Sequence, residues 1–68
     1  MKSVSGKELA SALERQGWVL KRITGSHHIY TKPGMLVRLS VPIHSNKPLK
    51  VGLLRHLLKQ ADLHEDDI

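Results

Sequence analysis

Apolar positions recur at helical spacing in two segments, one near each end of the chain. The first segment follows Ser5 and ends at Gly17, and its apolar face comprises Leu9, Ala12 and Leu13. The second segment runs from about Lys50 to Ala61, and its apolar face comprises Leu53, Leu54, Leu57, Leu58 and Ala61. The pattern therefore predicts two amphipathic helices, each with one face for burial.

Both ends of the first predicted helix carry sequence signals. Ser5 and Glu8 have the spacing of a capping box, in which each side chain accepts a hydrogen bond from the other residue's backbone N–H. Gly17 is expected to end the helix in the left-handed conformation, so that Trp18 folds back over Leu13. Local chemistry therefore supports this helix in addition to its apolar face.

Three strands are predicted between the helices. The segments Trp18–Thr24, His27–Lys32 and Met35–Val41 are rich in bulky or β-branched residues, and the last one alternates apolar positions with mixed ones. Turn signals separate these segments at Gly25-Ser26 and at Pro33-Gly34. Consecutive strands joined by such short turns are expected to pair as an antiparallel meander.

The order helix, strand, strand, strand, helix indicates an α+β fold. Its simplest closed form places two helices on one face of a three-stranded antiparallel sheet. The segment Pro42–Pro48 is predicted to be a loop, and Asp62–Ile68 an acidic tail with one further helical turn. At 68 residues, we expect a single domain over residues 1–68.

The distribution of charge indicates a polyanionic partner. Eleven Lys and Arg against six Asp and Glu give a formal net charge of +5, and four of the acids lie at positions 62 to 67. Residues 1–61 therefore carry +9, from 11 basic and 2 acidic side chains. A small domain with that excess attracts nucleic acid, although a basic surface without a ligand is the simpler alternative.

Several classes of protein are disfavoured by composition. The chain has no cysteine, so it has no disulfide and no thiolate nucleophile. No apolar run is long enough to cross a bilayer, and the N-terminus has no apolar stretch of signal-peptide length. We therefore expect a cytoplasmic protein without a membrane partner.

Histidine provides the candidate chemistry, because it is the one side chain here that ordinarily titrates near neutrality. His27 and His28 are consecutive in a predicted strand, so their side chains point to opposite faces and are poorly placed to share a metal ion. We expect no metal and no cofactor. A lone imidazole can still act as a general base and accept the proton of a ribose 2′-hydroxyl as that oxygen attacks its own phosphate.

The residues around His27 fit such a reaction. Gly25 would let a phosphate approach the backbone closely, and Ser26 offers a hydroxyl and an N–H. Tyr30 has the opposite strand parity to His27, and it either stacks on a base or lies half-buried. The alternation pattern leaves open which face of the sheet carries His27. The remaining RNA-binding candidates are Arg22, Lys32, Arg38, His44, Lys47 and Lys50.

Three runs of sequence resemble the HicA family of mRNA interferase toxins. They are Gly25–Tyr30, Val41–Ser45 and Lys47–Arg55, and the segments Ser5–Glu8 and Gln16–Trp18 are similar to that family too. The resemblance covers about residues 5 to 63 and is specific in its order and spacing.

This resemblance implies a fold like the double-stranded-RNA-binding domain and metal-independent cleavage of mRNA. It also implies a HicB-like antitoxin that covers the basic face. The family's catalytic histidine follows a glycine in a Gly-x-His motif, which here makes His27 the catalytic residue. His64 stands where the family often has a serine or threonine that caps a short last helix.

Two other functions remain open at this point. A non-catalytic module could use the same basic surface to bind double-stranded RNA. A protein-interaction module could instead present that surface to an acidic partner, in which case it would not bind RNA in a salt-sensitive way.

Overall fold

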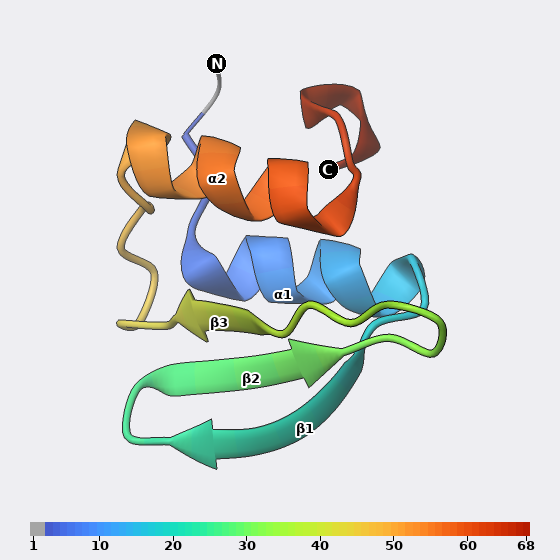
Figure 1. Cartoon of the computed structure of the whole chain (residues 1–68). Coiled ribbons are helices and arrows are strands. Elements are labelled where there is room, and N and C mark those ends of the chain that lie inside the picture. The colour runs from blue at the N-terminus through green and yellow to red at the C-terminus, as the bar shows by residue number, and fades with distance from the viewer. Residues whose placement is uncertain (1–2) are drawn as a thin grey trace.

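The computed structural model describes residues 3–68 and has the predicted α-β-β-β-α order (Figure 1). Met1 and Lys2, the first residues of the predicted domain, lie outside the described residues. The helices and strands are α1 (Gly6–Arg15), β1 (Val19–Thr24), β2 (His27–Thr31), β3 (Leu39–Pro42), α2 (Val51–Ala61) and a short 3-10 turn, η1 (Glu65–Asp67).

The predicted signals at both ends of α1 are confirmed. The Ser5 hydroxyl accepts from the Glu8 N–H at 3.1 Å, and the Glu8 carboxylate accepts from the Ser5 N–H at 3.0 Å. At the other end Gly17 has a φ of +96°, and the N–H of Trp18 donates to the carbonyl of Leu13 at 2.9 Å. This backbone path is a Schellman motif, and it turns the buried Trp18 into the core.

The three strands form one antiparallel sheet in the order β1-β2-β3. The third strand is shorter than predicted, because residues 35–38 pair with no strand. The partner strand β2 ends at Thr31, and Pro33 beyond it has no N–H to donate. Leu36 is consequently fully exposed, although its neighbour Val37 still packs against the core.

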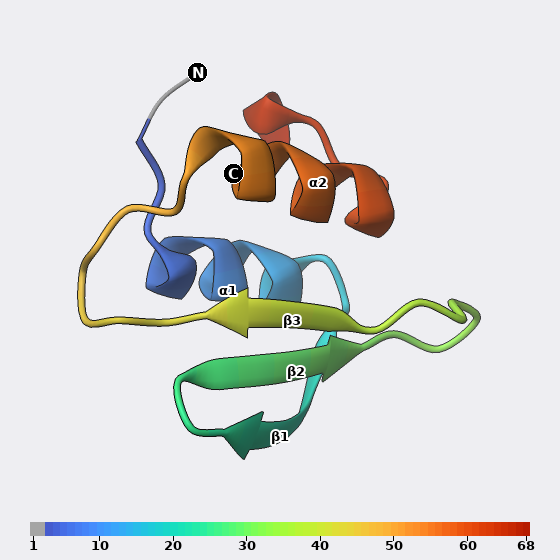
Figure 2. The ribbon, with the colours of Figure 1, turned by 60° about the vertical axis from the view of Figure 1, so that its left-hand side comes forward.

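Both helices lie on the same side of the sheet and contact β3, and α1 also contacts β1 (Figures 1 and 2). Their apolar faces meet β2 and β3 in one hydrophobic cluster. All six residues of β1 are exposed, so the helices leave this edge strand largely uncovered. The largest fully buried side chains are Tyr30, Leu9, Leu13, Leu39, Leu54, Val4 and Val41.

Helix α2 buries four of the five residues predicted for its apolar face, Leu54, Leu57, Leu58 and Ala61, whereas the fifth, Leu53, is exposed. It ends at Asp62, which has a φ of +58°, and the η1 turn follows. His64 does not prevent this turn, because its backbone N–H donates to the Asp67 carboxylate at 2.8 Å. No helix within residues 3–68 combines the length and apolar character needed to cross a membrane.

Close backbone contacts join α1, β3 and the loop that follows β3. Gly6 is buried against Pro42, and a Cβ atom at Gly6 would overlap the Pro42 carbonyl oxygen. The N–H of Leu49 donates to the carbonyl of Val4 at 2.7 Å, which ties the loop to the segment before α1. These contacts fix the loop against the start of α1, and the pairing of Pro42 with His27 places the beginning of the loop beside β2.

We predict that Gly6→Ala lowers the free energy of unfolding by about 1–3 kcal/mol. The added methyl group meets backbone atoms of Pro42, which cannot rotate away as a flexible side chain would. The measurement is the urea midpoint of the variant against the wild type.

Gly52→Ala is the matched control. Gly52 lies in α2 with nothing within 4 Å of a built Cβ, so alanine should raise the unfolding free energy by about 0.5–1 kcal/mol. Equal effects of the two substitutions would contradict the close approach between Gly6 and Pro42.

Candidate functional site

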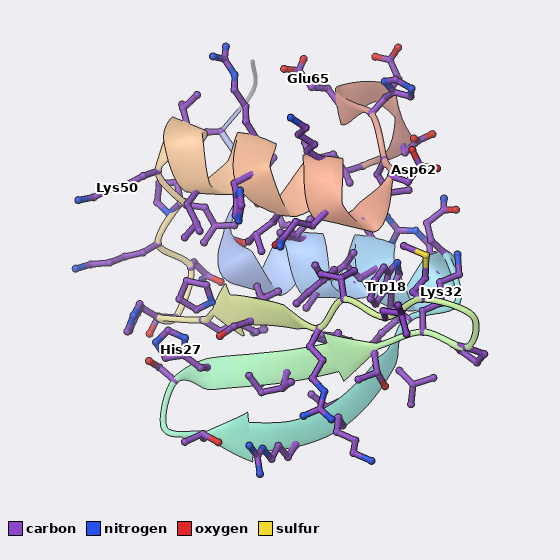
Figure 3. All side chains as sticks on the ribbon, viewed as in Figure 1. Trp18, His27, Lys32, Lys50, Asp62 and Glu65 are labelled. Atoms are coloured by element: carbon purple, nitrogen blue, oxygen red, sulfur yellow. The ribbon has the colours of Figure 1, made fainter. Side chains whose placement is uncertain are left out.

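His27 is the first residue of β2 and presents an exposed imidazole (Figure 3). Its Nδ1 atom lies 3.0 Å from the Oγ atom of Ser40 on β3. Its cross-strand partners are Pro42 on β3 and Thr24 on β1. The ring therefore stands at the end of the sheet where β1 turns into β2 and where β3 ends.

The register of the sheet settles which face carries His27. Tyr30 pairs with Leu39, His28 pairs with Val41, and Tyr30, Leu39 and Val41 are buried under the helices. Because strand side chains alternate, His27 lies on the opposite, open face. The imidazole is thus accessible to a large ligand without any movement of the core.

The contact with Ser40 can select the protonation pattern of the ring. When Nδ1–H donates to the Ser40 hydroxyl, the lone pair of the neutral ring is on Nε2. Nε2 is then the atom that can accept a proton from a ligand. In the other tautomer the Ser40 hydroxyl donates to Nδ1 and Nε2 carries the proton, so the contact fixes the orientation of the ring in either case.

The turn before His27 is open on one side and anchored on the other. Gly25 has a φ of +60°, and nothing lies within 4 Å of a Cβ built on it, so a ligand can approach the backbone here. The carbonyl of Ser26 accepts from the N–H of Ile43 at 2.8 Å. Ser26 thereby links the turn to the loop after β3.

One predicted cation from the sheet lies close to His27. Arg22 is exposed on β1 and pairs with Ile29 of β2. Ile29 is two residues after His27, whose own partner on β1 is Thr24. Arg22 and His27 are therefore diagonal neighbours on the same face, and such residues lie roughly 7–8 Å apart. The long guanidinium side chain can span that distance.

Three more predicted residues gather in the loop on the other side of His27. His44, Lys47 and Lys50 are all exposed, and they line a pocket of about 270 Å³ together with Pro42. Figure 3 shows Lys50 toward the same end of the molecule as His27. Because β3 ends at Pro42, opposite His27, the loop that follows β3 begins at the candidate site.

Lys32 and Arg38 lie at the other end of the sheet. Lys32 follows the last residue of β2 and Arg38 precedes the first residue of β3, whereas His27 begins β2. Lys32 is five residue steps from His27, each of about 3.3 Å along a strand, and Figure 3 shows the two residues far apart. The structure therefore does not bring these two cations to the candidate site.

Tyr30 does not fit its predicted role in RNA binding. Its ring is 1% exposed, and its hydroxyl donates to the Glu14 carboxylate at 2.8 Å. Burial, together with this bond to a carboxylate, raises the pKa of Tyr30 well above its ordinary value. The residue is a core anchor that ties β2 to α1, and it has no free face for a base.

His28 is half-buried on the helix side, opposite Val41 and Ile23, so it does not join His27. Within residues 3–68, no three His, Asp or Glu side chains form a group that could hold a metal ion. The arrangement at His27 instead combines one accessible imidazole, one hydroxyl and several cations.

Ser40 is the site residue that reasoning from sequence missed. The position reads as a polar member of the alternation in the third strand. Its distance from His27 in the chain is 13 residues, so only the register between β2 and β3 brings the two side chains together. A register derived from the pairing of Tyr30 with Leu39 would have found it.

A family model described as HicA toxin of bacterial toxin-antitoxin matches residues 6–63 of the 68-residue chain. A search among curated proteins gave no match. The matched span begins at the first residue of α1 and ends just beyond α2, so it contains the whole sheet and the surroundings of His27. The chain therefore belongs to the HicA toxin family of bacterial toxin–antitoxin systems.

Proposed function

We propose that this toxin is a metal-independent endoribonuclease that cleaves mRNA with His27 as its general acid and base. The observation that carries the proposal is the exposed His27 imidazole on the open face of the sheet, held through Nδ1 by Ser40, with Arg22 on the neighbouring strand and Lys47 and Lys50 in the loop after β3. Membership of a toxin family supplies the biological setting.

The proposed reaction needs only the substrate and the imidazole. His27 Nε2 accepts the proton of a ribose 2′-hydroxyl while that oxygen forms a bond to the adjacent phosphorus. The bond from phosphorus to the 5′-oxygen of the next nucleotide breaks, and that oxygen takes back the proton from the imidazolium. The products are a 2′,3′-cyclic phosphate and a free 5′-hydroxyl.

Cations around His27 would stabilise the charge that builds on the phosphate. Arg22 lies on one side of the ring, and Lys47 and Lys50 lie in the loop on the other side. A strand of RNA that passes over His27 would therefore meet positive charge before and after the scissile bond. Gly25 and Ser26 would shape its approach along the backbone of the turn.

A toxin of this kind is made together with an antitoxin, and we propose a HicB-like partner that covers the basic face. Residues 1–61 carry +9, so an acidic partner would be attracted over a long range and would exclude RNA from His27. The open face of the sheet needs no rearrangement to accept either ligand.

His27→Ala should lower the rate of RNA cleavage by about 10²–10⁴-fold, because it removes the proton acceptor. RNA affinity should change little, since the Lys and Arg side chains proposed to hold the phosphates all remain. Cleavage of a labelled RNA and fluorescence anisotropy with the same RNA measure the two quantities.

Two controls accompany this variant. His56→Ala removes an exposed histidine from α2 and should leave cleavage unchanged. An RNA with a 2′-deoxy residue at the scissile position should resist the wild-type protein. If wild type and His27→Ala both bind RNA and neither cuts it, the protein is a non-catalytic RNA-binding module.

Ser40→Ala should lower kcat by roughly 3- to 10-fold, which is the worth of one neutral hydrogen bond, and should leave KM nearly constant. The imidazole remains in place but loses the group that orients it. Ser40→Thr keeps the hydroxyl and suits a strand, so it should retain most of the activity. The positioning role is wrong if the threonine variant is as slow as the alanine variant.

Lys50→Gln should weaken RNA binding and reduce the slope of log affinity against log salt by about 0.7, because one phosphate contact to a single strand is lost. Lys32→Gln removes the same charge at the far end of the sheet and should leave the slope nearly unchanged. RNA affinities measured from about 50 to 200 mM salt give this slope for each variant.

A further inference from the structure

A pocket that extends from Pro42, at the end of β3, to Leu53 on α2 is lined by apolar and basic residues. We name it the Pro48 pocket; we call its apolar lining residues, Pro42, Pro48, Leu49 and Leu53, the floor, and its other lining residues, His44, Lys47 and Lys50, the rim. Most of its lining surface is apolar, and no acidic residue takes part. A site of this composition suits a ligand that is flat and apolar on its faces and negatively charged beside them.

The backbone holds the Pro48 pocket in shape. Pro48 forms an isolated antiparallel bridge with Ser5, and the N–H of Leu49 donates to the carbonyl of Val4 at 2.7 Å. A turn closed by the bond from the Lys47 N–H to the His44 carbonyl, 3.0 Å, precedes them. The floor therefore does not need to form when a ligand arrives.

The pocket and the proposed catalytic residue are connected through Pro42. Pro42 lines the pocket and is the cross-strand partner of His27. Directly opposite residues of an antiparallel pair have Cβ atoms roughly 4.5–5.5 Å apart. A phosphate held at His27 would therefore bring the base of an adjoining nucleotide within reach of the pocket.

Bases of single-stranded RNA are usually held by stacking on aromatic side chains, and the tryptophan and the tyrosine of this chain are both too buried to provide a ring for it. Trp18 and Tyr30 are its two aromatic residues, and they are 2% and 1% exposed. The apolar floor of the Pro48 pocket offers a substitute next to His27. Its volume of about 270 Å³ lies below the roughly 300–1,000 Å³ of pockets for drug-sized ligands, which suits a single base.

We propose that the Pro48 pocket binds one nucleobase of single-stranded RNA, on the nucleotide adjoining the scissile phosphate, while Lys47 and Lys50 hold the phosphates beside it. This inference rests on the proposed ribonuclease function and names a substrate subsite for it. Substrate preference would then arise at the loop after β3, where the side chains lie outside the core of the fold.

The test measures binding and cleavage separately. The binding probes are an RNA pentanucleotide and the same pentanucleotide with an abasic ribose at its central position, added to the cleavage-deficient His27→Ala protein. Backbone amide shifts in residues 42–53 should respond to the intact RNA, and the abasic RNA should bind about tenfold more weakly.

Leu53→Ser should remove most of this difference between intact and abasic RNA, because it takes away part of the apolar floor. Val51→Ser is the matched control, since Val51 lies on the same helix, is 49% exposed against 36% for Leu53, and does not line the pocket. Leu53→Met keeps an apolar side chain and should restore the difference. Thermal melts confirm that each variant is folded.

Several outcomes would contradict the proposal that the Pro48 pocket binds a nucleobase. These are equal affinity for intact and abasic RNA, amide shifts confined to β1, equal behaviour of Leu53→Ser and Val51→Ser, or tighter binding of an acidic peptide than of RNA at the same amides. The last result would assign the pocket to a protein partner. If wild-type protein fails to cut RNA while the base-dependent binding persists, the ribonuclease proposal is wrong but the Pro48 pocket is still a nucleobase-binding site.

Discussion

The register between β2 and β3 is the constraint on which the candidate site depends. It sets Tyr30 opposite Leu39 in the core, and so it places His27 opposite Pro42 on the open face. Since side chains alternate along a strand, a slip of one residue would bury the imidazole and expose the tyrosine. The bond of the Tyr30 hydroxyl to Glu14 on α1 secures this register, because it forms only when Tyr30 points toward the helices.

Local chemistry made much of the fold predictable. The capping box at Ser5, the Schellman motif at Gly17 and the apolar face of α2 are short-range patterns, and the structure has them where they were expected, apart from the exposed Leu53. The family resemblance is also confirmed by the match over residues 6–63. The resemblance pointed to His27 through the spacing of a short motif, which needs no knowledge of how the strands pair.

The features that sequence did not reveal depend on contacts between distant residues. Met35 and Val37 fit the alternation of a strand, yet β2 ends too early to pair with that part of the chain. Lys32 is as basic as Lys50, and only the direction of β2 separates it from His27. The Pro48 pocket likewise requires the segment before α1 to meet the loop after β3.

The uncovered edge strand β1 has a consequence for how the protein behaves at high concentration. Leu20 and Ile23 are exposed on this strand, and a free, apolar edge is a template on which other chains can add strands. Lys21 and Arg22 stand between them, and the register of β1 is interrupted at Lys21. Charge and local twist at this point act against such additions, so these two cations help to keep the folded chain from aggregating through its edge.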